Sequence, residues 1–245
     1  MNNTKKKSPI SWVPTAYFAM GLPFVVLNMV TVLMFKGLEV DDKLITFWTS
    51  LILLPWTLKP LWSPFLELFR TKKFFVIVTQ LITGITFGLV AFALNLSHFF
   101  SISIALLAIV AFSGATHDIA CDGVYMSELS NEDQARFIGW QGAFYNIAKI
   151  LATGGLVYLA GYFIELNADA GLLTANKRAW MIILLILSVT MILLGIYHLF
   201  ALPSTQSASS RKTLRSNKEV MKELGQVLMD FFRKTHITYY ICFII

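Results

Sequence analysis

Residues 179–202 read AWMIILLILSVTMILLGIYHLFAL, a stretch of 24 residues without Asp, Glu, Lys or Arg. An α-helix rises 1.5 Å per residue, so about 20 residues cross the roughly 30 Å hydrocarbon core of a bilayer. Hydrocarbon offers no water to backbone N–H and C=O groups, and a helix satisfies those groups internally. This stretch therefore predicts a transmembrane helix.

The rest of the chain repeats this pattern. Further apolar runs occupy residues 10–35, 44–69, 74–96, 99–126 and 137–164, and another begins near Ile237. Of the 245 residues, 56% are hydrophobic and only 14% are charged, whereas soluble domains carry about 25% charged residues. Strands of a lipid-spanning barrel need only 9–11 residues, so runs of this length predict an all-α membrane protein with six full spans.

Basic residues gather on one side of the predicted membrane. Most of the 20 Lys and Arg residues precede the first run or follow the second, fourth and sixth runs. The positive-inside rule therefore places the N-terminus in the cytoplasm, and the net charge of +6 needs no nucleic acid to explain it. The predicted organisation is a basic N-terminus (1–9), a six-helix bundle (10–202), a cytoplasmic linker (203–235) and the start of a seventh helix (236–245).

The linker has two parts. Its first part is rich in Ser and basic residues and predicts an exposed connection. Residues 219–234 then place their apolar side chains on one helical face. This part is either an amphipathic helix on the membrane surface or a solvated extension of the seventh helix.

Four ionisable residues fall deep inside the runs: Lys59, Asp118, Asp122 and Lys149. Such groups are costly in hydrocarbon, so they are expected to be paired or functional. Asp118 and Asp122 are four residues apart and share one helical face. In one interpretation Asp118 and Lys149 line a central cavity, where Asp118 takes up the coupling proton. In the other, Lys59 and Asp122 form a buried structural pair. His117 is then either a proton relay or a hydrogen-bonded packing residue.

Further polar residues predict a binding surface. Gln141, Tyr145 and Lys149 recur every four residues and form one stripe on the fifth run. A polar stripe on a spanning helix faces a cavity or a neighbouring helix rather than lipid. Tyr17 and Asn28 on the first run can reach the same pocket. We therefore expect these five residues to contact a solute.

The sequence contains no known catalytic or nucleotide-binding motif, such as GxSxG, HExxH or a P-loop. Asp118 and Asp122 have a spacing compatible with metal binding, but no further ligands complete a site. We therefore expect no enzyme activity, no cofactor and no metal, and a proton gradient as the energy source.

Three motifs resemble one family. Residues 17–23 (YFAMGLP), 58–64 (LKPLWSP) and 115–123 (ATHDIACDG) are similar to the corresponding segments of AmpG-type muropeptide permeases, in the major facilitator superfamily. The resemblance covers residues 11–202. It implies twelve helices, a rocker-switch motion and proton-coupled import of cell-wall fragments across the bacterial inner membrane. Between the second and third spans the superfamily's loop pattern is altered, since Ser63 replaces its glycine and Phe69 intervenes before Arg70. Glu67 keeps the acidic position, so the resemblance still implies a gating ion pair of Glu67 and Arg70.

Together these features predict the N-terminal six-helix bundle of a proton-driven transporter. Its partners would be protons, the lipid bilayer, an amphiphilic solute such as a muropeptide, and a second six-helix half. The alternatives are another solute, such as a sugar, an acyl-CoA-like compound or an exported drug, and a membrane scaffold or partner subunit that transports nothing.

Overall fold

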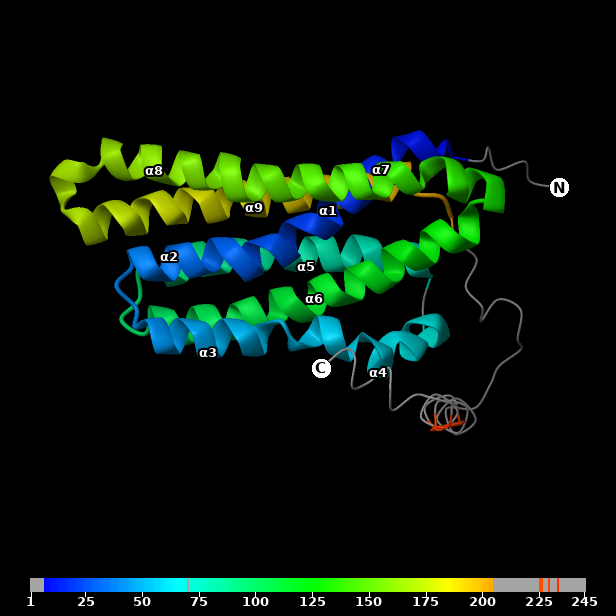
Figure 1. Ribbon diagram of the computed structural model, residues 1–245, viewed down its shortest axis with the longest axis horizontal. Helices are drawn as coiled ribbons and strands as arrows, with labels where there is room; N and C mark the ends of the chain where they lie inside the picture. Colours follow the sequence, from blue (N-terminus) through cyan, green and yellow to red (C-terminus); the bar gives the residue numbers. More distant parts are fainter. Residues whose placement is uncertain (1–6, 70, 205–224, 227–228, 230–232, 234–245) are drawn as a thin grey trace.

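The computed structural model describes residues 7–69 and 71–204, together with residues 225, 226, 229 and 233 (Figure 1). This part of the chain is helical and holds six helical spans long and apolar enough to cross a membrane. The prediction of an all-α, multi-pass membrane protein is therefore confirmed. Residues 1–6, Arg70, the predicted seventh helix and nearly all of the predicted amphipathic segment lie outside the described residues.

Three of the six spans are built from more than one helical segment. The first span joins a short 3-10 turn (Pro9–Ser11), α1 (Val13–Val25), the π-helical η2 (Val26–Val30) and α2 (Thr31–Gly37). The second joins α3 (Asp42–Ile52) and α4 (Leu54–Phe69), and the fifth joins α7 (Asn131–Ile150), the π-helical η3 (Leu151–Leu156) and α8 (Val157–Leu166). The other three spans are α5 (Lys72–Ala93), α6 (Phe99–Glu128) and α9 (Leu172–Ala201), the last following a 3-10 turn at Ala168–Ala170.

Several helices begin before the apolar runs that predict them. The fifth span begins at Asn131 rather than residue 137, because the Ser130 hydroxyl accepts a hydrogen bond from the backbone N–H of Asp133. Thr71 caps α5 in the same way, and Asp41 caps α3. A side-chain cap of this kind contributes about 1 kcal/mol. Polar first turns can therefore extend a helix beyond the hydrocarbon, where hydropathy carries no signal.

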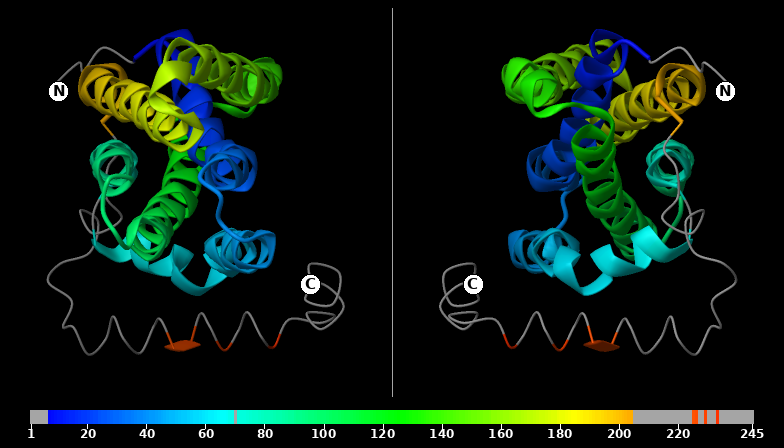
Figure 2. Two further views of the ribbon diagram at one scale, coloured as in Figure 1. Left: turned by 90° about the vertical axis from the view of Figure 1, so that its left-hand side faces the viewer. Right: turned by 90° about the vertical axis from the view of Figure 1, so that its right-hand side faces the viewer.

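The helices run side by side along the long axis of the molecule, and α6 crosses the bundle obliquely (Figures 1 and 2). Helix α5 packs between α6 and α9, α1 packs along α7, and α4 lies mainly against α6. The two π-helical segments, η2 and η3, contact each other. The break between α3 and α4 precedes Pro55, whose ring nitrogen has no hydrogen to donate.

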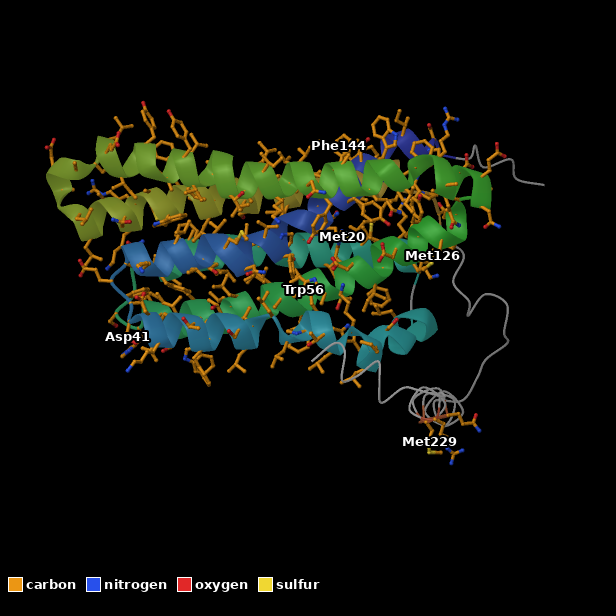
Figure 3. The ribbon with its side chains drawn as sticks, in the orientation of Figure 1. Met20, Asp41, Trp56, Met126, Phe144 and Met229 are labelled. Atoms are coloured by element: carbon orange, nitrogen blue, oxygen red, sulfur yellow. The ribbon has the colours of Figure 1, made fainter. Side chains whose placement is uncertain are left out.

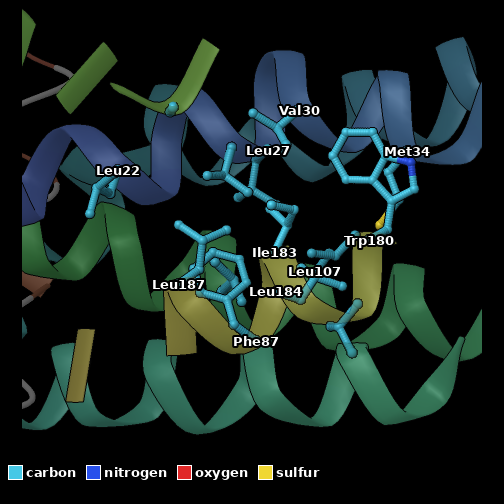
Figure 4. Packing of buried hydrophobic residues seen from close by; sticks show 14 of the residues in the cluster. Leu22, Leu27, Val30, Met34, Phe87, Leu107, Trp180, Ile183, Leu184 and Leu187 are labelled. Carbon is cyan, nitrogen blue, oxygen red and sulfur yellow. The ribbon is translucent and has the colours of Figure 1, made fainter. Parts of the chain in front are cut away.

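Buried apolar side chains form two clusters. The larger includes Leu27, Phe87, Leu107, Ile183 and Leu187 (Figure 4). The smaller cluster lies at the end of the bundle where the first span begins, and it includes Trp12, Val76, Val124 and Leu202. Along α5 and α6 the interval between the clusters holds buried polar residues instead. These are Thr79, Gln80, Thr83, Thr86, Ser113, His117 and Asp118. We call this set the polar layer, and it contains the candidate site.

Candidate functional site

Asp118 on α6 meets two residues of α4. Its Oδ2 atom lies 2.7 Å from Lys59 Nζ and accepts a hydrogen bond of 2.9 Å from the indole N–H of Trp56. The residue is 8% exposed, and its other oxygen, Oδ1, has no hydrogen-bond partner among the described residues. Asp118 is therefore a buried carboxylate with one paired oxygen and one unpaired oxygen.

The local sequence explains this contact. Trp56 and Lys59 are three residues apart, so they share one face of α4. Gly114 lies one turn before Asp118 on α6, and a Cβ added to it would come within 2.9 Å of the Trp56 ring. The missing side chain at Gly114 thus lets the indole lie directly on α6. Figure 3 shows Trp56 where the second span meets α6.

Asp122, one turn further along α6, has a different set of partners. Its Oδ1 atom accepts a hydrogen bond of 2.8 Å from the Tyr17 hydroxyl of α1, and Gln141 Nε2 of α7 donates to the same hydroxyl at 2.9 Å. The Tyr17 ring is buried and packs edge-to-face on Tyr125, with 5.9 Å between the ring centroids. Asp122 itself is exposed on the surface of the bundle. This cluster joins α1, α6 and α7.

Close packing of α1 on α7 makes the Tyr17–Gln141 contact possible. A Cβ added to Gly21 would lie 3.0 Å from both Ala148 Cβ and the backbone oxygen of Tyr145. Only glycine therefore allows this approach without displacing α7. Tyr145, which the sequence predicts to contact solute, is half-buried at this helix junction.

The remaining predicted solute contacts lie apart from these clusters. Lys149 is exposed on α7, and its ammonium group makes no hydrogen bond or ion pair within the described part of the chain. Asn28 is exposed within the π-helical η2. Of the five predicted solute contacts, the structure thus brings Tyr17 and Gln141 into direct contact and leaves Lys149 and Asn28 open.

The pairing of the ionisable groups differs from the sequence-based expectation. Lys59 pairs with Asp118 rather than with Asp122, because Asp122 lies further around α6 and faces Tyr17. Asp118 and Lys149 do not meet, since Asp118 faces α4 and Lys149 lies on the open surface of α7. The expected gating pair falls outside the described residues, as the structure describes neither the Glu67 side chain nor Arg70.

His117 has the buried, hydrogen-bonded environment that its interpretation as a packing residue predicts. It is buried, and its Nε2 atom lies 2.9 Å from Gln80 Nε2 of α5. Gln80 Oε1 lies 2.9 Å from His198 Nδ1 of α9, and His198 Nε2 lies 2.9 Å from the Thr15 hydroxyl of α1. A continuous chain of side-chain hydrogen bonds thus links four helices.

Sequence reasoning missed Trp56, Gln80 and His198. The spacing of Trp56 from Lys59 could have indicated that both contact the same partner, because residues three apart on a helix are neighbours. Gln80 and His198 are single polar residues inside long apolar runs, and buried polar groups require partners. That rule predicts a partner for each, but it does not name the partner, which depends on how the helices pack.

In the part of the chain that the structure describes, no three His, Cys, Asp or Glu residues come together to form a metal-ion site. Comparison of the chain with protein-family models and with curated proteins finds no match.

Proposed function

We propose that this chain is the N-terminal six-helix half of a proton-coupled secondary transporter of the major facilitator superfamily, importing a muropeptide or a similar amphiphilic solute. The observation that supports it best is the pair of the buried Asp118 with the half-buried Lys59, in which one carboxylate oxygen stays unpaired. Ionisable groups within membrane spans are costly, and they commonly mark proton and solute pathways.

The depth of Asp118 suits a coupling site. It lies ten residues before the end of α6 at Glu128, which corresponds to about 15 Å, half of the hydrocarbon thickness. A proton on Asp118 removes the charge that holds Lys59 Nζ at 2.7 Å. Proton uptake would therefore weaken the contact between α4 and α6, and loss of the proton would restore it.

The open polar groups suit an amphiphilic or anionic solute. Gln141, Tyr145 and Lys149 follow one line on α7, spanning about 12 Å over eight residues. Tyr17 and Gln141 offer hydrogen bonds near one end of this line, and the unpaired Lys149 ammonium offers a positive charge at the other. A sugar–peptide carrying carboxylates matches this arrangement, and the motif resemblance favours it over other solutes. The second six-helix half would supply the facing wall.

The proposal is tested by uptake of labelled anhydro-muropeptide into proteoliposomes that contain the complete natural protein, with the external pH varied. Asp118→Asn should abolish the dependence of uptake on the proton gradient. The matched control is Asp169→Asn, in the short 3-10 turn before α9, which should leave that dependence unchanged. Wild-type pH dependence in Asp118→Asn would contradict the proton role.

The same assay separates the alternatives. Competition by sugars, acyl-CoA compounds or drugs, without competition by muropeptide, would identify another solute. Absence of flux for every solute tested, together with recovery of a stable partner protein, would favour a scaffold that transports nothing.

A further inference from the structure

The polar layer fixes α6 against α5 at two successive turns. On α6, Ser113 Oγ donates a hydrogen bond of 2.8 Å to the backbone oxygen of Thr79 and accepts one of 3.0 Å from Thr83 Oγ1. One turn later, His117 accepts a hydrogen bond from the Gln80 amide. Ser113 and His117 share a helical face. Together they define both the rotation and the axial position of α6 on α5.

Helix α5 is itself held closely against α9. A Cβ added to Gly84 would lie 2.7 Å from Ile192 Cγ1 and 2.9 Å from the backbone oxygen of Ser188. Gln80, one turn before Gly84, is 0% exposed and bonds His198 of α9 as well as His117 of α6. Gln80 thus connects α6 to a platform formed by α5 and α9.

The orientation of Asp118 follows from this connection. Asp118 is the residue after His117, so it points about 100° further around α6. His117 faces α5 while Asp118 faces Trp56 and Lys59 of α4. Helix α4 packs mainly on α6, so the direction of the Asp118 side chain depends on contacts made by a different face of its own helix.

A small rotation is enough to break the ion pair. A side-chain tip lies about 5 to 6 Å from the helix axis, so a rotation of about 20° displaces it by about 2 Å. Directed away from Lys59, such a displacement adds to the 2.7 Å between Lys59 Nζ and Asp118 Oδ2 and ends the contact. A buried amide is also costly to leave unpaired, which favours the one rotation that satisfies Gln80.

From this geometry we propose that Gln80 and His117 are positioning residues, whose mutual hydrogen bond aims Asp118 at Lys59. The consequence for proton coupling rests on the proposed function, whereas the effect on the Lys59–Asp118 pair does not. The two can therefore be tested separately.

The direct test is a double-mutant cycle of Lys59→Met and Asp118→Asn on thermal unfolding of the purified full-length protein. The whole cycle is measured in three backgrounds. These are the wild type, Gln80→Leu/His117→Leu, and the conservative variant His117→Gln, whose amide can still bond Gln80. The double Leu variant removes both groups of the Gln80–His117 hydrogen bond, and it also leaves the buried His198 Nδ1 without its Gln80 partner. A milder variant is Gln80→Asn, whose shorter side chain keeps an amide but moves it away from the imidazoles of His117 and His198. The control is Thr31→Val, which removes a buried hydroxyl bonded only to the Leu27 backbone of its own span.

We expect the shift in unfolding temperature that reports Lys59–Asp118 coupling to fall to less than half of its wild-type size in the double Leu variant and in Gln80→Asn. It should stay at the wild-type size in His117→Gln and Thr31→Val. Undiminished coupling in the folded double Leu variant would overturn the proposal. Failure of both the double Leu variant and Gln80→Asn to fold would also overturn it, in favour of a purely structural role.

Uptake measurements then test the link to function. The pH profile of uptake should shift in the double Leu variant and return towards the wild type in His117→Gln. Uptake by the wild type that does not depend on pH would refute the proposed proton coupling, while the mutant cycle would still decide whether Gln80 and His117 position Asp118.

Discussion

Removing the Lys59 charge should destabilise the protein through Asp118. In Lys59→Met the Asp118 carboxylate keeps only the Trp56 hydrogen bond. Its side chain is only 11% exposed, so water compensates little of the remaining charge. Breaking a fully buried ion pair costs about 3–5 kcal/mol because a charge is left uncompensated. Lys59 is 28% exposed, so solvent screening lowers the expected cost to about 2–3 kcal/mol. For a protein of this size that loss lowers the unfolding midpoint by about 4–12 °C.

A thiol-reactive dye suits the measurement, because Cys121 is buried and becomes accessible on unfolding. The assay uses a Cys242→Ser background, which leaves Cys121 as the single thiol of these 245 residues. The control is Lys36→Met, which breaks the exposed pair of Lys36 and Asp42, 3.5 Å apart. Exposed pairs contribute about 0–1 kcal/mol, so that midpoint should barely move.

The decisive variant is Lys59→Met/Asp118→Asn, which removes both charges of the pair. It should recover at least half of the stability lost in Lys59→Met, since no unpaired carboxylate remains. If the double variant is as unstable as Lys59→Met, the lysine stabilises the protein through packing of its stem, and the argument from charge is wrong.

Three further predictions use the same protein. Tyr17→Phe removes the hydroxyl between Asp122 and Gln141, and solute affinity in a binding assay should fall about tenfold, the equivalent of one net hydrogen bond. Lys149→Gln should weaken binding of an anionic solute most at low ionic strength and leave the unfolding midpoint unchanged, because the ammonium has no partner among the described residues. Gly84→Ala should lower the unfolding midpoint, since an added Cβ meets a side chain at 2.7 Å. Gly161→Ala adds a Cβ with no atom within 4 Å. It should raise the midpoint, because glycine within a helix is about 0.5–1 kcal/mol less stable than alanine.

The spans were predictable because membrane insertion depends on the length and hydrophobicity of a continuous stretch, and both can be read directly from the sequence. Residues 179–202 and the other runs exceed the length needed to cross hydrocarbon. Their ends were less predictable. Asn131 and Leu172 begin helices well outside the apolar runs, because caps and turn geometry, not hydropathy, determine where a helix starts.

The pairing within the site could not be predicted from the sequence in the same way. The sequence places Lys59, Asp118 and Asp122 within the apolar runs, and depth alone makes either carboxylate a suitable partner for Lys59. The choice between them depends on the rotation of α6, which places Asp118 against Trp56 and Asp122 against Tyr17. That rotation is set by contacts such as Gln80–His117, which join residues far apart in the sequence.

Two neighbouring residues of the polar layer each keep a buried polar atom without a partner in the described part of the chain, Nδ1 of His117 and Oδ1 of Asp118. An unsatisfied buried group costs about 1–3 kcal/mol, and a layer that served only to hold helices together would be more stable with an apolar residue at position 118. The hydrogen bonds of Trp56 and Lys59 occupy only Oδ2 of Asp118. A proton can therefore bind Oδ1 without displacing either donor, and it would still remove the charge that attracts Lys59. For this reason the coupling proton that we propose for Asp118 would bind Oδ1, where binding requires the least prior rearrangement of the contact that it would weaken.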